Sequence, residues 1–323
     1  MNSKYGKANW FNILFIGANT LVALIGGPWY YFRYGLSASE ITLMVFFIYA
    51  TGFGITAGYH RLYTHQTYKA HPVVHFFMLF FGAAAFQQSA LAWTSQHRNH
   101  HQYVDTDADP YNIKKGFFWA HMGWLIFGKF DFFYDNVDDL IRSKLIMHQA
   151  RHYVLWGVVA GIVTPVAIGA LTGHALGAFI FSVCFRITFV YHSTWCINSV
   201  CHMFGKTTYD ADSSSRDNWM VAVVALGEGY HNFHHRFPSD YRNGVRWYQP
   251  DFSKWLIFTL EKLGLVWNVK RIEASRIEEA RRIAAKKIQE KNKRPGMSFR
   301  AAEMKEGGGS VPDEEGTEVS ALP

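Results

Sequence analysis

Half of the sixteen histidines in this chain are concentrated in three short stretches. Residues 60–65 have the pattern H-x-x-x-x-H, and residues 97–101 and 231–235 share the pattern H-x-x-H-H. On a helix, positions i, i+3 and i+4 lie on one face, so each H-x-x-H-H is expected to direct its imidazoles the same way. Neutral imidazole is the commonest ligand of redox metals such as iron. Because zinc is saturated by about four ligands, so many histidines predict a pair of metal ions held almost wholly by nitrogen.

A single histidine is more often a capping or core residue than a ligand, so the repetition carries this interpretation. The histidines outside the three stretches gain no support from it, with one exception described below. They are His71, His75, His121, His148, His152, His174 and His192.

Hydropathy predicts an all-α integral membrane protein with four transmembrane helices. Only 18% of the residues are charged, whereas an ordinary soluble domain has about 25%. Apolar runs near the length that crosses about 30 Å of hydrocarbon occupy residues 11–31, 41–58, 153–171 and 175–197. The first run has no cleavage site and is followed at once by another, so it is not a signal peptide.

A fifth apolar run, residues 73–93, is expected to be a buried or interfacial helix that does not cross the membrane. Gln87, Gln88 and Ser89 interrupt it. If it crossed, the first two histidine stretches would lie on opposite faces of the membrane and could not share a site. With four spans, every histidine stretch lies on one side and forms a helical cap there.

The distribution of basic residues predicts the orientation. The loops 32–40 and 172–174 together contain a single Arg or Lys, whereas the opposite side contains Lys4, Lys7, Arg61, Lys69, Lys114, Lys115, Lys129, Arg142, Lys144 and Arg151. The positive-inside rule then places both termini and the histidine stretches in the cytoplasm. The inner membrane of a bacterium is the expected location.

The C-terminal part differs from the membrane domain, which we expect to span residues 1–269. Residues 270–294 alternate Glu with Arg and Lys and keep Ile at helical intervals. They predict an amphipathic helix that rests on anionic headgroups or an acidic partner, or has a simply solvated face. Residues 295–323 are expected to be disordered. The three cysteines contain no C-x-x-C, so neither a disulfide framework nor an iron–sulfur cluster is indicated.

The order of the three histidine motifs resembles the integral-membrane fatty acyl desaturases, in particular the delta-9 acyl-CoA branch that includes stearoyl-CoA desaturase. The flanking strings G-I-T-A-G (54–58), D-T-D-A-D-P (105–110) and G-E-G (227–229) also match. The likeness extends from about residue 11 to residue 269. It implies desaturation of a long-chain saturated acyl group with dioxygen, which forms a cis double bond.

The resemblance also implies the metal ligands. In the family, the segment after the last span supplies a further histidine at the position of His202 and an asparagine at the position of Asn198 that holds a metal-bound water. Asn198 and His202 are i and i+4 on a helix, which permits this role. The implied ligand set for two iron ions is His60, His65, His97, His100, His101, His202, His231, His234, His235 and, through water, Asn198. Acids that could orient the imidazoles are Asp105, Asp107, Asp109 and Glu228.

A long acyl chain requires an apolar tunnel. Positions that match the family's tunnel bend are Gln87, Trp93 and Thr194, although Trp93 could also be an interfacial anchor. Ile48 and Gly52 share a helix face and are expected to form the tunnel floor, unless Gly52 only lets two helices approach. The animal enzymes have an Arg-Asp pair where this chain has Ser95 and Gln96.

The acyl carrier and the electron donor are less sharply defined. Lys114 and Lys115 keep a basic pair that could meet phosphates. The carrier is therefore CoA, a carrier protein or an intact lipid, and CoA is the expected one. No fused redox domain is evident, so a separate ferredoxin, rubredoxin or b-type cytochrome is expected to supply electrons. No nucleic-acid partner is expected.

Two other functions compete with desaturation. A diiron membrane hydroxylase of an alkane or lipid shares the histidine pattern, usually with other spacings. A metal transporter would place its ligands near the middle of the bilayer, whereas the histidine stretches here lie outside the predicted spans.

Overall fold

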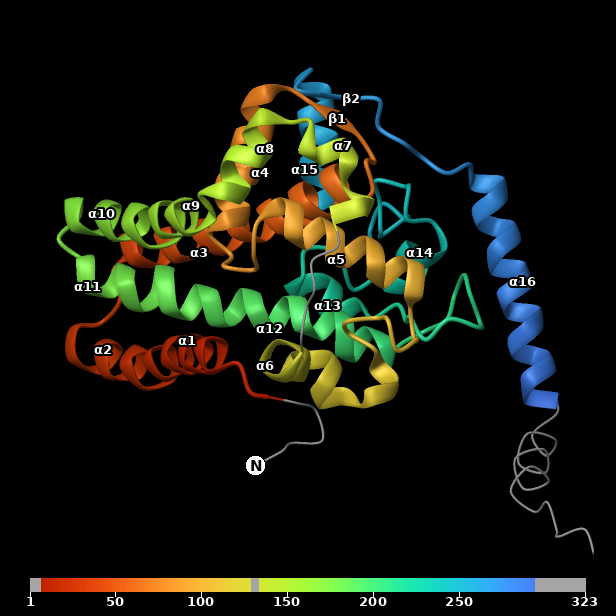
Figure 1. The fold of residues 1–323 in the computed structure, drawn as a ribbon, viewed down its shortest axis with the longest axis horizontal. Helices are drawn as coiled ribbons and strands as arrows, with labels where there is room; N and C mark the ends of the chain where they lie inside the picture. Colours follow the sequence, from red (N-terminus) through yellow and green to blue (C-terminus); the bar gives the residue numbers. More distant parts are fainter. Residues whose placement is uncertain (1–6, 129–133, 294–323) are drawn as a thin grey trace, which may run out of the picture.

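The computed structural model describes residues 7–128 and 134–293, and these residues are mostly helical (Figure 1). Within these ranges, four helices are long and apolar enough to cross a membrane: Trp10–Tyr34, Ala38–Thr64, Tyr153–Leu171 and Ala175–His202. They confirm the predicted all-α membrane architecture and its four spans. The predicted disordered tail lies outside the described residues.

Each span consists of shorter helical pieces joined without a break. The α-helical pieces are α1 (Trp10–Leu21) and α2 (Gly27–Tyr34), then α3 (Ala38–Phe53), then α9 (Tyr153–Val158) and α10 (Thr164–Leu171), and finally α11 (Ala175–Gly177) and α12 (Arg186–Ser199). Wider π-helical turns lie between or after them, at Val22–Gly26, Gly54–Thr64, Val159–Val163 and Ala178–Phe185.

Three of the four spans are longer than the sequence predicted, and the first ends at Tyr34 instead of Tyr31. The second continues to Thr64 and the fourth to His202, so His60 and His202 lie on the ends of spanning helices, not outside them. Hydropathy stops where polar residues begin, but the whole π-helical segment Gly54–Thr64 is buried by other parts of the protein. A Cβ at Gly54 would lie 2.3 Å from the backbone nitrogen of Gly82, so glycine allows this close packing.

The fifth apolar run forms two helices instead of the single one expected. The first is α4 (Pro72–Ala83) and the second is α5 (Ala90–Tyr103). At 1.5 Å per residue, the twelve residues of α4 cover about 18 Å, which is too short to cross about 30 Å of hydrocarbon. The chain reverses between them, with positive φ angles at Phe86 (55°) and Gln88 (77°). Ser89 caps the start of α5 by accepting from Ala92 N.

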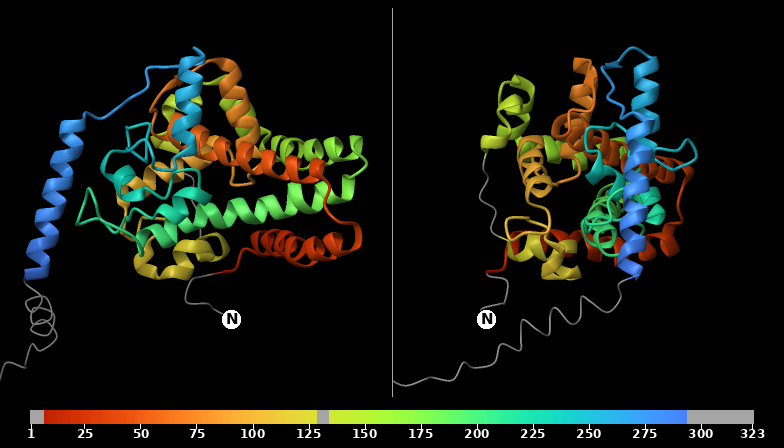
Figure 2. Two further views of the ribbon diagram at one scale, coloured as in Figure 1. Left: turned by 180° about the vertical axis from the view of Figure 1, so that it is seen from behind. Right: turned by 90° about the vertical axis from the view of Figure 1, so that its right-hand side faces the viewer.

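The remaining elements gather at one end of the spans. They are α6 (Trp124–Phe127), α7 (Asp138–Ile141), α8 (Lys144–Arg151), α13 (Trp219–Val224), α14 (His231–Arg236), α15 (Phe252–Lys262) and α16 (Ala274–Lys293), with the antiparallel pair β1 (Lys69–Ala70) and β2 (Val266–Trp267). The opposite end holds the α2–α3 and α10–α11 connections (Figures 1 and 2). The apolar side of α16 (Ile277, Ala280) packs on Tyr209, Phe233 and Phe237 of the same chain.

A fully buried arginine holds the reversal after α4 in place. Arg186, on the fourth span, donates to the carbonyls of Ala84, Gly161 and Ser182. Its Nη1 also lies 3.3 Å from Thr51 Oγ1. Backbone carbonyls that end a helix inside a membrane protein must find donors within the protein, and this one guanidinium joins α4 to the second, third and fourth spans.

Removal of this guanidinium should destabilise the fold. Arg186→Met leaves buried carbonyls without a donor, and an unsatisfied buried group costs about 1–3 kcal/mol. We expect a loss of about 3 kcal/mol or more in the free energy of unfolding, measured as a lower thermal unfolding temperature in detergent. Arg142→Met, at an exposed position, is the control. Equal unfolding temperatures for the two variants would contradict the role given to Arg186.

Candidate metal centre

Nine histidines converge into two groups at the end of the second and fourth spans. In each group, the candidate ligand atoms all lie within 4.8 Å of one another. We call the first the five-histidine group (His60, His65, His97, His101, His234) and the second the four-histidine group (His100, His202, His231, His235). The structure therefore brings together every histidine that the sequence nominated.

Each H-x-x-H-H motif is divided between the two groups, contrary to the expectation that its imidazoles point the same way. α5 directs His97 and His101 into the five-histidine group and His100 into the four-histidine group. α14 does the reverse and directs only its middle histidine, His234, into the five-histidine group. Neighbouring residues on a helix are about 100° apart around its axis, so two adjacent histidines serve two different centres. Because α5 and α14 each contribute histidines to both groups, the two groups lie side by side.

Within each group, the Nε2 atoms face one another. The separations are 3.0 Å for His60–His234, 2.9 Å for His234–His101 and 3.2 Å for His101–His97. In the second group they are 3.1 Å for His202–His231 and 2.9 Å for His231–His235. Two nitrogens that are each about 2.1 Å from one ion and at right angles to each other are about 3.0 Å apart. The spacing fits adjacent ligands of a shared metal ion.

The buried ring nitrogens also fit a metal. Nε2 of His65 and Nε2 of His100 are buried and have no hydrogen-bond partner within the described residues, and such an orphan is costly unless something binds it. Burial and the neighbouring imidazoles keep the pKa of His97, His101 and His234 well below the ordinary value. These rings are therefore neutral at physiological pH, as metal ligands must be. An all-imidazole donor set suits a transition metal and not Mg²⁺ or Ca²⁺.

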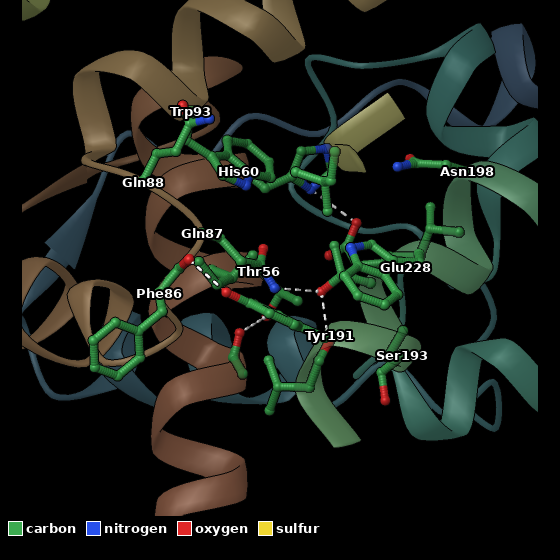
Figure 3. A pocket seen from close by; sticks show the side chains of 18 of the residues that line it. Thr56, His60, Phe86, Gln87, Gln88, Trp93, Tyr191, Ser193, Asn198 and Glu228 are labelled. Atoms are coloured by element: carbon green, nitrogen blue, oxygen red, sulfur yellow. Dashed lines mark hydrogen bonds and ion pairs between the residues drawn. The ribbon is translucent and has the colours of Figure 1, made fainter. Parts of the chain in front are cut away.

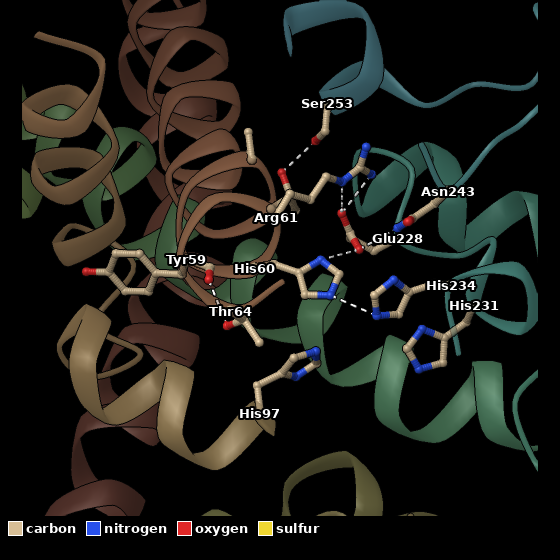
Figure 4. Close-up of polar contacts among 12 residues, drawn as sticks. Tyr59, His60, Arg61, Thr64, His97, Glu228, His231, His234, Asn243 and Ser253 are labelled. Carbon is tan, nitrogen blue, oxygen red and sulfur yellow. Dashed lines mark hydrogen bonds and ion pairs between the residues drawn. The ribbon is translucent and has the colours of Figure 1, made fainter. Parts of the chain in front are cut away.

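Glu228 orients His60 through a buried ionic network (Figure 4). Its Oε2 lies 2.8 Å from His60 Nδ1, and its Oε1 accepts from the Arg61 guanidinium at 2.9 Å. Arg61 also pairs with Asp251 at 2.9 Å, and Asn243 donates to Glu228 at 2.7 Å. Although burial opposes ionisation, His60 and Arg61 lower the pKa of Glu228 to about 2. The carboxylate therefore fixes the Nδ1 proton of His60 and leaves Nε2 free for a metal.

Two further contacts orient the four-histidine group. Asp109 Oδ1 lies 2.9 Å from His100 Nδ1, and Ser214 Oγ lies 2.7 Å from His202 Nδ1. Ser214 in turn donates to Asp105 at 2.8 Å, so Asp105 acts on His202 through a hydroxyl. The Asp107 side chain is 99% exposed and contacts no histidine of either group. Of the four nominated acids, three therefore lie behind a histidine.

Sequence reasoning missed three residues that support the centre: Ser214, Arg61 and Asp251. Ser214 belongs to a loop that Asn232 and Asp217 fold back over α14. Asn232 donates to Ser215 O at 3.0 Å, and Asp217 accepts from the backbone of Asn232 at 2.9 Å. Local sequence patterns do not predict contacts between residues so far apart in the chain. Arg61 follows His60 directly. Its burial follows from the extension of the second span to Thr64, which hydropathy did not predict.

A cavity opens from the metal centre into the bundle of spans (Figure 3). His60, His97, His231 and Glu228 line one part of it. Five of the seven predicted substrate positions line it as well: Ile48, Gly52, Gln87, Trp93 and Thr194.

Polar side chains mark particular points along the cavity wall. Gln87 donates to Thr194 Oγ1 at 3.0 Å, which ties the reversal after α4 to the fourth span. Asn198 is nearly buried and also lines the cavity. The two lysines do not line it. Lys115 lies 3.7 Å from Asp107 and over the Trp119 ring at 5.3 Å, and Lys114 is exposed.

Comparison with known proteins places these features in one family. The family described as "Fatty acid desaturase" matches residues 40–270. The "Probable acyl-CoA desaturase" of Schizosaccharomyces pombe is 37% identical over 86% of this chain and 58% of its own length. The "Delta(9)-fatty-acid desaturase fat-7" of Caenorhabditis elegans is 37% identical over 81% of this chain and 79% of its own. The "sn-1 stearoyl-lipid 9-desaturase" of Anabaena variabilis is 34% identical over 82% and 94% respectively. The chain thus spans little more than half of the S. pombe relative.

Loss of one orienting acid should weaken metal binding. Asp109→Asn removes the carboxylate charge behind His100, and substitutions of this kind typically lower metal affinity about 10–100-fold. We expect the variant to lose metal faster than the native chain during dialysis against a chelator, measured by inductively coupled plasma mass spectrometry. Asp107→Asn is the same change at the exposed acid. If both variants retain metal equally well, Asp109 does not support the centre.

Proposed function

We propose, since this chain belongs to the fatty acid desaturase family, that it uses dioxygen to introduce a cis double bond at the delta-9 position of a saturated long-chain fatty acyl group. The observation that carries the proposal is the continuity between the two histidine groups and the cavity between the spans. A hydroxylase is not favoured, because the relatives named above are all desaturases.

Two iron ions are the metals that we assign to the groups. All nine histidines would serve as ligands, and Asn198, which lines the cavity as His231 does, would act through a water. Iron bound there would supply the reduction of dioxygen and the removal of hydrogen from an unactivated methylene, for which no side chain is a strong enough oxidant.

The chain's own residues position the substrate. Apolar side chains from the spans form most of the cavity wall and keep water away from the acyl chain. The Gln87–Thr194 hydrogen bond lies in that wall, and the Trp93 ring stacks on His97 of the five-histidine group. The methylene beside the centre is thus selected by how far the chain enters, and Ile48 and Gly52 limit that depth.

We propose a CoA thioester as the substrate, with an intact lipid as the competing form. The S. pombe relative is named for acyl-CoA and the A. variabilis relative for a lipid. Lys114 and Lys115 lie outside the cavity, where they could meet CoA phosphates as charges. Ser95 and Gln96 are buried on α5, so they do not replace an exposed ion pair. A lipid extract and a CoA thioester, offered separately, would decide between the carriers.

We propose a ferredoxin, a rubredoxin or a b-type cytochrome as a separate electron-donor protein. Helices α5 and α14, which carry histidines of both groups, lie at the same end of the spans as the C-terminal elements (Figures 1 and 2). The predicted charge asymmetry assigns that end to the cytoplasm, where such donors are found.

The activity test is lipid analysis of a host that expresses the chain. Gas chromatography–mass spectrometry should detect a new delta-9 monounsaturated product. His100→Ala and His234→Ala, one from each group, should abolish the product without loss of the protein from the membrane. His152→Ala, an exposed histidine, should leave it unchanged. Product formation by either ligand variant would contradict the two-metal assignment.

The depth of the cavity should set the preferred chain length. Gly52 lies eight residues before His60, about 12 Å along the helix, and a Cβ there would lie 2.6 Å from Leu226 Cδ1. Gly52→Leu should therefore fill the cavity floor and shift the products toward shorter chains, measured with saturated substrates of several lengths. Gly17→Leu is the control, because a Cβ at Gly17 meets nothing within 4 Å. An equal loss for all lengths would make Gly52 a packing residue.

A further inference from the structure

Trp93 is the large aromatic side chain in closest contact with the metal centre. Its ring lies nearly parallel to that of His97, with 4.8 Å between centroids and 22° between planes. The His60 ring is 6.1 Å away. Both histidines belong to the five-histidine group, so an oxidant formed there is in contact with an indole.

Two buried tyrosines extend this contact away from the cavity. The Tyr59 ring lies 6.2 Å from Trp93, and the Tyr63 ring lies 6.3 Å from Tyr59. Tyr59 is 0% exposed and Tyr63 is 2% exposed. The three rings therefore form a continuous series inside the protein, and the tyrosines lie on the side of the second span that faces away from the substrate cavity, which neither of them lines.

The series ends at a proton acceptor. The Tyr63 hydroxyl lies 3.2 Å from Nδ1 of His75 on α4 and 3.3 Å from the His75 carbonyl oxygen, to which it can also donate. His75 is partly exposed. The Tyr59 hydroxyl instead accepts from Gln149 at 2.6 Å, and an amide N–H cannot take a proton. A phenol loses an electron readily only when a base receives its proton, and neutral imidazole is such a base. Of the three residues, Tyr63 is therefore the one expected to hold the oxidising equivalent, as a neutral tyrosine radical.

We propose that Trp93, Tyr59 and Tyr63 form a redox relay that drains oxidising equivalents from the metal centre when no acyl chain is bound. The proposal rests on the oxygen-dependent function above. Trp93 would give one electron to an oxidised metal centre and would take one from Tyr63, with the Tyr59 ring as the bridge between them. The O–H bond of Tyr63 breaks, and its proton passes to Nδ1 of His75. A one-electron reductant from solution, such as a thiol or ascorbate, then restores Tyr63, and the proton returns from His75.

Such a relay protects the chain from its own chemistry. Without a substrate methylene, the oxidisable groups beside the centre are the histidine ligands, Trp93 and Tyr111, whose ring lies 5.0 Å from that of His100. If the rings served packing alone, their hydroxyl groups would be dispensable. A redox role and a packing role therefore differ in whether the Tyr63 hydroxyl is needed. Tyr63→Phe removes this hydroxyl and keeps the ring.

The experiment compares the full-length iron-loaded chain in detergent with two variants. Reduced protein is mixed with dioxygen in the absence of acyl substrate, frozen and examined by electron paramagnetic resonance, with ring-deuterated tyrosine to identify a tyrosine radical. Tyr68→Phe is the matched control, because Tyr68 is also buried but its hydroxyl donates to Ala57 O at 2.7 Å, whereas the Tyr63 hydroxyl also lies beside an imidazole nitrogen. Peptide mass spectrometry measures oxidation of Trp93 and His97 in the same samples.

We expect a tyrosine radical in the native chain and in Tyr68→Phe, and its loss in Tyr63→Phe, together with faster oxidation of Trp93 and His97. Desaturation with substrate present should be unchanged in Tyr63→Phe. An unchanged radical and unchanged damage in Tyr63→Phe would overturn the relay, as would a native chain that desaturates its substrate but forms no tyrosine radical.

A photochemical arm separates failure of the relay from failure of the proposed function. A ruthenium polypyridyl photo-oxidant replaces dioxygen and needs no metal-centred reaction. The tyrosine radical should again form in Tyr68→Phe and be lost in Tyr63→Phe. If the radical patterns of the two variants are the same, the relay is wrong, whatever the product analysis shows. If they differ while no desaturated product is found, the proposed function fails and the relay stands.

Discussion

The buried ionic network of Arg61, Glu228 and Asp251 is the contact on which the metal centre depends. It joins the end of the second span to the segment before α14 and to the start of α15, over 167 and 190 residues of sequence. A guanidinium without water is stable only when carboxylates and carbonyls surround it, so the segments that supply them must be in place together. Because Glu228 also binds His60 Nδ1, the same network that closes the fold sets the direction of a histidine. The contacts that hold these segments together therefore also orient the His60 ring.

The pattern of the sequence predicted the class of fold and the convergence of the histidines, but not how they divide. Apolar length is a local property, so four spans could be counted from it. Where a helix ends depends on burial by distant segments, and the second span therefore reaches Thr64. The helical wheel places i, i+3 and i+4 on one broad face, yet the two centres are close enough for that face to serve both. His100 and His101 are neighbours in sequence and belong to different groups.

The predicted substrate residues that follow from the apolar pattern line the cavity, whereas those predicted from charge do not. Ile48, Gly52, Trp93 and Thr194 lie on helices whose course follows from the apolar pattern. Gln87 lies in the reversal after α4, and all five residues line the cavity. Lys114 and Lys115 lie on a short 3₁₀ turn (Ile113–Lys115), and charge alone does not fix the direction of a lysine. The contacts behind the ligands, such as Ser214 on His202, arise from loops. Loop conformation is set by tertiary hydrogen bonds that no local spacing encodes.

The interior of this protein holds more polar groups than an apolar bundle tolerates unless each has a partner. Arg186 supplies donors to three carbonyls where α4 and two spans deviate from regular α-helix, and Arg61 and its carboxylates neutralise one another. The histidine groups differ from these two arginine networks, because their ring nitrogens are not fully satisfied by protein partners. Ring nitrogens that face one another at about 3 Å can share only one proton per pair. In addition, His65 and His100 each have a buried nitrogen without a hydrogen-bond partner within the described residues. A transition metal resolves both problems at once. Binding of the metal and stability of this end of the fold are thus coupled, and the acids that orient the ligands contribute to both.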